Sequence, residues 1–74
     1  MKALKTLVKA YGFTTDSEYF EYCINSYLNG NIKQAKELFN QMKFEDKKRF
    51  ILEYTEYYDN PSQQNSYKFF INLI

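Results

Sequence analysis

Apolar residues recur along this chain at intervals of three and four residues, the spacing that aligns side chains on one face of an α-helix. Polar and charged residues fill the positions between them. The tyrosine-rich stretch 50–58 could alternatively form a β-strand, but its apolar residues keep the helical period. The pattern therefore predicts five helices, over residues 2–11, 16–29, 32–43, 45–58 and 61–73.

Residues typical of helix ends separate these predicted helices. Gly12 and Gly30 directly follow two apolar stripes, and glycine commonly ends a helix because it adopts a positive φ freely. Thr15 is followed three residues later by Glu18, which is the capping-box pattern of a helix start. The connection around Gly30 is so short that the second and third helices must form an antiparallel hairpin. The sequence predicts an all-α fold with one domain over 1–74, a compact bundle of four to five short helices around a central αα-hairpin.

The apolar stripes also predict the core. A chain of 74 residues buries only about 60–65% of its unfolded surface, so its stability is marginal without extra support. A single cysteine excludes an intrachain disulfide, so aromatic packing or a partner must supply that support. The residues expected on the inward stripes are Leu4, Leu7, Val8, Tyr11, Phe20, Cys23, Ile24, Tyr27, Leu28, Ala35, Leu38, Phe39, Met42, Phe50, Ile51, Tyr54, Tyr58, Tyr67, Phe70, Ile71 and Ile74.

One local pattern resembles a known repeat. Within residues 22–43, a small-residue turn at Gly30 is followed by Ala35 and then by Phe39, with Met42 close behind. This stretch is similar to a single helical hairpin of the tetratricopeptide and pentatricopeptide class. The resemblance implies two antiparallel helices joined by a tight turn. It does not imply a repeat protein, because the chain has one such hairpin and about three are needed for a stable stack. Any tight αα-hairpin also needs a glycine cap and a small residue at the crossing.

The same stretch also resembles the start of a DNA-binding helix-turn-helix. The match fails further along, because Asn40 and Gln41 stand where the turn glycine and a buried aliphatic residue belong. Asp46 occupies an inward position of the recognition helix, where a buried carboxylate is costly. Readout of DNA by this motif is therefore not favoured.

The chain has more aromatic side chains than a small core needs, with eight tyrosines and seven phenylalanines. Several tyrosines fall off the apolar stripes or at their edges, and exposed tyrosine is enriched at protein interfaces. The candidate protein interface consists of Tyr19, Tyr22, Tyr57 and Tyr58.

Lysines form a second candidate surface. Lys2, Lys5 and Lys9 line one side of the first predicted helix, and Lys33 and Lys36 align on the third. If these lysines were adjacent in space, they would form a basic face for a nucleic acid or an acidic partner. The alternative is that they are ordinary solvated positions. The net charge of +1 favours neither interpretation.

Side chains that perform catalysis are scarce. The chain has no histidine, and it has no Gly-rich phosphate loop or Walker pattern. Cys23 lies on an apolar stripe, so a buried structural thiol is expected. We expect no enzyme activity, no cofactor, no metal site and no catalytic residue.

The sequence gives coarse indications of where the protein is located and of the genome that encodes it. No stretch approaches the roughly 18 apolar residues that cross a bilayer. A single free cysteine fits a reducing, cytoplasmic compartment. Residue types read from AT-rich codons make up about half of the chain, which favours a phage or other mobile element of an AT-rich bacterium.

The leading hypothesis is a small interaction module that binds or inhibits a host or phage protein. The alternatives are a nucleic-acid-binding regulator and a self-associating structural protein such as a homodimer.

Overall fold

The computed structural model describes residues 2–55 and 64–74. This part of the chain contains five α-helices and no strand, which confirms the predicted all-α class. One turn of π-helix, η1 (Ile51–Thr55), continues the fourth helix directly. The α-helices are α1 (Leu4–Ala10), α2 (Asp16–Leu28), α3 (Ile32–Asn40), α4 (Phe44–Phe50) and α5 (Gln64–Ile71).

The end of α1 and both ends of α2 lie within one residue of the predicted positions, whereas α1 begins at Leu4 and not at residue 2. Gly12 and Gly30 both have positive φ, at 76° and 84°. After α1, the Phe13 N–H donates to Val8 O at 2.8 Å, which closes a Schellman ending. At the start of α2, the hydroxyl of Thr15 accepts from the Glu18 N–H while the Glu18 carboxylate accepts from the Thr15 N–H, a complete capping box.

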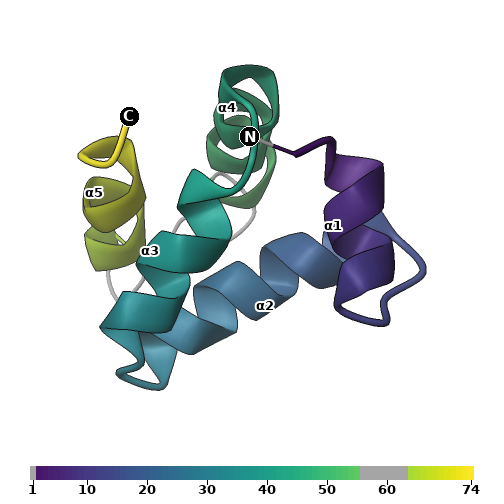
Figure 1. Ribbon diagram of the computed structural model, residues 1–74. Helices are drawn as coiled ribbons and strands as arrows, with labels where there is room; N and C mark the ends of the chain where they lie inside the picture. Colours follow the sequence, from purple (N-terminus) through teal and green to yellow (C-terminus); the bar gives the residue numbers. More distant parts are fainter. Residues whose placement is uncertain (1, 56–63) are drawn as a thin grey trace.

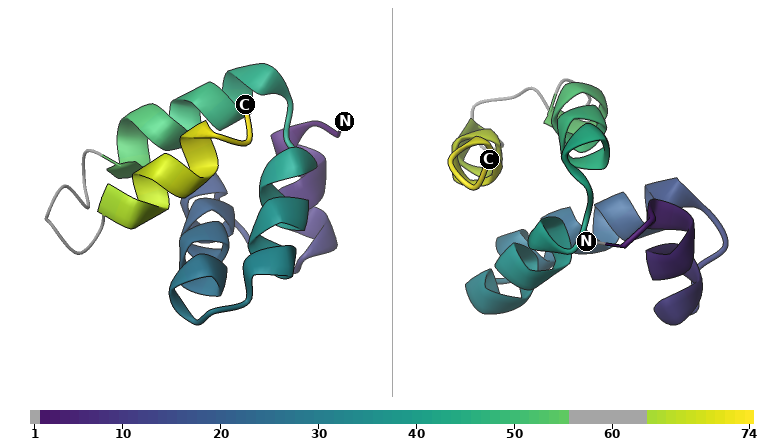
Figure 2. Two further views of the ribbon diagram at one scale, coloured as in Figure 1. Left: turned by 90° about the vertical axis from the view of Figure 1, so that its left-hand side faces the viewer. Right: turned by 45° about the horizontal axis from the view of Figure 1, so that its top comes forward.

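The helices pack in two groups. α2 and α3 form the predicted antiparallel hairpin, and α1 packs against the first half of α2 (Figure 1). α5 lies alongside α4 and η1, and this pair runs across the α2–α3 hairpin (Figure 2). The arrangement has a Cα radius of gyration of 11.3 Å, as expected for a compact chain of this size.

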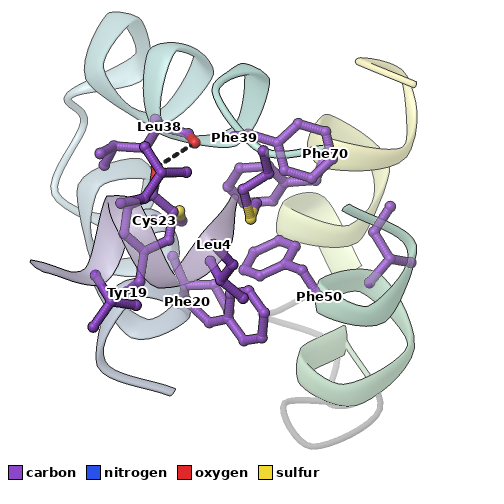
Figure 3. Packing of buried hydrophobic residues seen from close by; sticks show 14 residues of the cluster. Leu4, Tyr19, Phe20, Cys23, Leu38, Phe39, Phe50 and Phe70 are labelled. Carbon is purple, nitrogen blue, oxygen red and sulfur yellow. Dashed lines mark hydrogen bonds between the residues drawn. The ribbon is translucent and has the colours of Figure 1, made fainter. Parts of the chain in front are cut away.

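Four phenylalanines, one from each of α2 to α5, meet where the two groups of helices cross (Figure 3). Phe50 lies at the centre, with its ring centroid 5.4 Å from that of Phe20, 5.6 Å from that of Phe39 and 4.9 Å from that of Phe70. All four side chains are fully buried, and the rings of Phe20, Phe39 and Phe70 each pack edge-on or tilted against a neighbour in the cluster. This cluster joins the two groups of helices and buries four of the seven phenylalanines of the chain.

The structure corrects the predicted boundaries of the later helices. α3 ends at Asn40 and not at residue 43. The Met42 N–H donates to Phe39 O at 3.2 Å instead of continuing the helix, the chain is extended at Lys43, and the Lys2 N–H donates to Gln41 O at 3.1 Å just beyond the helix end. The predicted helix 45–58 is α-helical only to Phe50, then continues as η1, and its residues 56–58 lie outside the described residues. Residues 50–55 are helical, so the strand alternative is wrong for them. α5 begins at Gln64, and residues 61–63 of the predicted last helix also lie outside the described residues.

Candidate binding surfaces

The predicted tyrosine interface is not assembled in the part of the chain that the structure describes. Tyr19 is fully buried, which corrects the expectation that it faces solvent. Tyr22 is half-buried and packs against the core. Tyr57 and Tyr58 lie outside the described residues. The part of the interface assigned to Tyr57 and Tyr58 stays a prediction, and the surfaces considered below are those of the described residues.

Tyr19 is buried because its hydroxyl group has a partner in the interior. The side chain points from α2 toward α3, and its hydroxyl donates to the carbonyl oxygen of Leu38 at 2.7 Å (Figure 3). Burial raises the pKa of this phenol well above its ordinary value. The helical pattern placed Tyr19 at the edge of an apolar stripe, and the hydrogen bond allows a polar atom to enter the core there.

Tyr22 belongs to a small aromatic cluster between the end of α1 and α2. Its ring lies 5.6 Å from that of Phe13 and 6.0 Å from that of Tyr11 between centroids. The side-chain amide of Gln34 donates to the Tyr22 hydroxyl, which links α2 to α3. Tyr11, which the sequence placed on an inward stripe, is 39% exposed. This cluster supports the packing of α1, and only its outer edge is open to a partner.

The predicted basic face is divided between different parts of the surface. All five of its lysines are exposed. Lys5 and Lys9 line a cleft between α1 and α4, whereas Lys33 lines a separate hollow with Tyr11 and Glu37. Each of these hollows also contains carboxylates, so neither forms a purely basic surface. The structure thus gives the lysines no single phosphate-binding strip.

The hollow between α1 and α4 has a volume of about 720 Å³, and we call it the α1–α4 cleft. Its floor is apolar and its rim is charged with both signs. Asp16, the first residue of α2, also lines it. The lining residues are Ala3, Leu4, Lys5, Val8, Lys9, Phe13, Thr14, Asp16, Lys43, Glu45, Asp46 and Arg49.

Arg49 holds α4 to the start of α2 at the end of this cleft. Its Nη1 donates to Asp16 Oδ2 and its Nε donates to Glu53 Oε1, both at 3.1 Å. The guanidinium group also lies 5.2 Å from the centroid of the Phe20 ring. The pair with Glu53 joins residues four positions apart in the chain. The partners are about half exposed, so each pair contributes at most about 1 kcal/mol.

Exposed apolar side chains gather on α5. Tyr67 is 43% exposed, Ile71 is 38% exposed and Ile74, just beyond the helix, is 49% exposed. These three residues are spaced four and three apart and define what we call the α5 outer face. Phe70 is fully buried, and Phe69 and Leu73 pack against the core from the other side. The sequence placed the outer residues on the same inward stripe as Phe70, and the structure corrects that assignment.

The groups that could react are few within residues 2–55 and 64–74. Cys23 is fully buried, and burial raises the pKa of its thiol. No three carboxylate or thiol side chains among these residues are grouped as metal ligands. No helix of the described segments has the length and apolar content that crossing a bilayer requires.

Comparison with known protein families, with curated proteins and with solved structures finds no match to this chain. The function is therefore inferred from the surfaces of the chain itself. Two of them stand out, the α5 outer face and the α1–α4 cleft. The first is apolar and the second combines an apolar floor with charges of both signs.

Proposed function

We propose that this protein is a small, non-enzymatic interaction module that binds another protein through the α5 outer face. The observation that carries the proposal is the distribution of apolar residues around α5. Around α5, the apolar positions from Phe69 through Phe70 and Tyr67 to Ile71 cover an arc of about 200° at 100° per residue. A helix that packs with one side against a small domain needs an apolar arc about half as wide. The remaining apolar positions of α5 therefore favour a contact with a second protein.

The charge of α5 supports a protein partner over a nucleic acid. Lys68 is the one charged residue between Gln64 and Ile74. An apolar surface with so little charge offers nothing to phosphate groups, but it suits the apolar centre of a protein interface. The aromatic ring of Tyr67 is the kind of side chain that anchors such interfaces.

The chemistry of the chain supports binding over catalysis. The sequence has no histidine, and its single thiol is buried and held protonated. A nucleophile of this kind is inert. The composition favours a phage or other mobile element, so we expect the partner to be a host or phage protein in the cytoplasm, whose surface this module occupies or inhibits.

The test is a pull-down with the full tagged chain from an AT-rich bacterial host, with and without nuclease. The α5 variant carries Tyr67→Gln and Ile71→Gln. The matched control carries Phe44→Gln on α4 and Leu52→Gln on η1, and these two side chains are 57% and 56% exposed. Glutamine keeps helix propensity high, so the helical circular dichroism should be unchanged in both. We expect one protein to be retained by the wild type and the control after nuclease treatment and lost with the α5 variant.

Other outcomes would replace the proposal. Equal retention by the α5 variant would show that this face is not the interface. Material that disappears on nuclease treatment would favour the nucleic-acid-binding alternative and its five lysines. Recovery of the bait alone, with light scattering that reports a dimer, would favour self-association through the same face.

A further inference from the structure

The turn between α2 and α3 contains Asn29 followed by Gly30, which is the only Asn–Gly pair in the sequence. The backbone nitrogen that follows an asparagine can attack Cγ of the asparagine side chain, which closes a five-membered succinimide ring. Glycine hinders this attack least, because it carries no side chain. Both residues are exposed, and the Asn29 side chain makes no hydrogen bond within the described residues. The turn therefore contains a reactive pair that is open to water.

The end of α2 requires the glycine but not the asparagine. Gly30 has a φ of 84°, and a Cβ added to it would meet no atom within 4 Å, so the backbone angle alone demands glycine here. α1 ends in a similar way at Gly12, which has a φ of 76°, and there Tyr11 stands at the position before the glycine. The helix ending therefore does not account for the presence of Asn29.

The fold turns the two reacting atoms away from each other. Ring closure requires the Gly30 nitrogen to eclipse Asn29 Cβ about the Cα–C bond. The ψ of Asn29 is 2°, which leaves that nitrogen about 120° from the eclipsed position. Two hydrogen bonds hold this angle, from the Gly30 N–H to Tyr27 O at 3.0 Å and from the Asn31 N–H to Ser26 O at 2.8 Å. The ring cannot close until both bonds open.

We propose that Asn29 is a site of spontaneous covalent modification that the folded α2–α3 turn keeps closed, so that its conversion requires the turn to open. In the open turn, the Gly30 nitrogen bonds to Asn29 Cγ and the bond from Cγ to the side-chain nitrogen breaks. That nitrogen leaves as ammonia and takes the proton of the Gly30 N–H. Water then opens the ring at one of its two carbonyl groups, which gives aspartate or isoaspartate.

Either product weakens the turn. Isoaspartate lengthens the backbone by one carbon where α2 ends, so the two N–H groups of Gly30 and Asn31 no longer match their acceptors. Aspartate places a negative charge at the C-terminal end of α2, where it opposes the helix dipole, and the last turn of α2 has no basic residue. The turn lies next to Tyr27, whose ring centroid is 4.6 Å from that of Phe69 on α5. A weakened turn therefore also loosens a contact that orients α5.

The test measures conversion at Asn29 by peptide mass spectrometry after incubation at mildly alkaline pH. We expect the native full chain to convert at least about tenfold more slowly than a synthetic peptide of residues 25–34, because opening of the turn limits the rate. The full chain unfolded in urea should convert as fast as the peptide. Equal rates for the native chain and the peptide would overturn the proposal, and so would the absence of conversion at Asn29 in urea.

A matched pair of variants tests whether the turn opens locally. Asn31→Ala removes the N-cap of α3, whose side chain accepts from the Gln34 N–H at 3.4 Å, and Thr15→Ala removes the N-cap at the far end of α2. We expect Asn31→Ala to raise the native conversion rate by about fivefold, as the loss of a cap implies. Thr15→Ala should leave this rate nearly unchanged, because its effect falls elsewhere. Equal acceleration by both variants would show that conversion needs global unfolding, against the proposal.

The consequence for the fold is measured on the converted chain itself. After conversion in urea and refolding, the wild type should unfold at a lower urea concentration than before. Asn29→Gln is the control for the same incubation, because its longer side chain cannot form the five-membered ring, and its unfolding midpoint should not change. An equal loss in both chains would contradict the assignment of the damage to this turn.

Discussion

Replacing Tyr19 with phenylalanine removes one hydroxyl group from the core and leaves the ring in place. That hydroxyl donates to Leu38 O at 2.7 Å. Leu38 lies in the last turn of α3, where backbone carbonyl groups have no further helical partners. The Met42 N–H, which would reach Leu38 if the helix continued, bonds to Phe39 O instead. Tyr19 therefore satisfies a carbonyl group at a buried helix end.

The expected cost follows from this geometry. Leu38 is 1% exposed, so water cannot easily replace the lost donor. Leaving a buried carbonyl unsatisfied costs about 1–3 kcal/mol. The total stability of a 74-residue domain is about 4–11 kcal/mol. With a urea m-value of about 1 kcal/mol/M for a chain of this size, the unfolding midpoint of Tyr19→Phe should fall by about 1–3 M with m unchanged.

Tyr11→Phe is the matched control, because it removes the same group from an exposed site. The Tyr11 hydroxyl accepts from Gln41 Nε2 at 3.0 Å, and its side chain is 39% exposed. Water can replace this partner, so the change in unfolding free energy should stay within about 0.5 kcal/mol. Urea unfolding followed by circular dichroism measures both variants. Equal midpoints for the two would refute the assignment of Tyr19 as a buried cap of α3.

Three further predictions concern other parts of the core and surface. Phe50→Ala should destabilise the fold by about 3–5 kcal/mol, because it removes the ring that joins three others; a loss of less than 1 kcal/mol in urea unfolding would contradict this. The Cys23 thiol should react with a thiol reagent only as fast as the chain opens, so its labelling rate should rise with urea, and rapid labelling in native buffer would disprove its burial. Hydrogen bonds from the Thr14 hydroxyl and the Thr14 N–H lower the pKa of Glu18 below its ordinary value of 4.5. The charged form of Glu18 therefore stabilises the fold above pH 4.5, and this contribution is lost as the pH falls through the lower pKa of the folded state. Glu18→Gln should therefore make the melting temperature fall less steeply on the acid side. Parallel profiles of melting temperature against pH for the variant and the wild type would show that the carboxylate of Glu18 is not involved.

The helices were predictable because the signals that set them lie within a few residues of one another. The Thr15–Glu18 capping box and the Gly12 and Gly30 endings are interactions between neighbours in the chain. The contact just beyond α3 was not predictable, because it is a hydrogen bond to Gln41 O from Lys2, which is about forty residues away. No local pattern carries that information.

The candidate surfaces were less predictable than the helices. Tyr19 looked like an edge residue until its hydrogen bond to Leu38 placed it inside. The lysines of α1 and α3 share a spacing, but the packing of the helices places Lys5 and Lys33 in different hollows. The α1–α4 cleft had no signal in the sequence, since its walls come from segments about forty residues apart.

The sequence by itself determined the helical class, the central hairpin and most of the core, including Phe20, Phe39, Phe50 and Phe70. It could do so because helical periodicity and capping act over three or four residues. Only the tertiary structure decided which side of α5 faces inward. Both sides of that helix are apolar, so its pattern alone allows either, and the choice was made by contacts of Phe69 and Phe70 with Tyr27 on α2. Those contacts left Tyr67 and Ile71 outside, which is why the proposed interface depends on the fold.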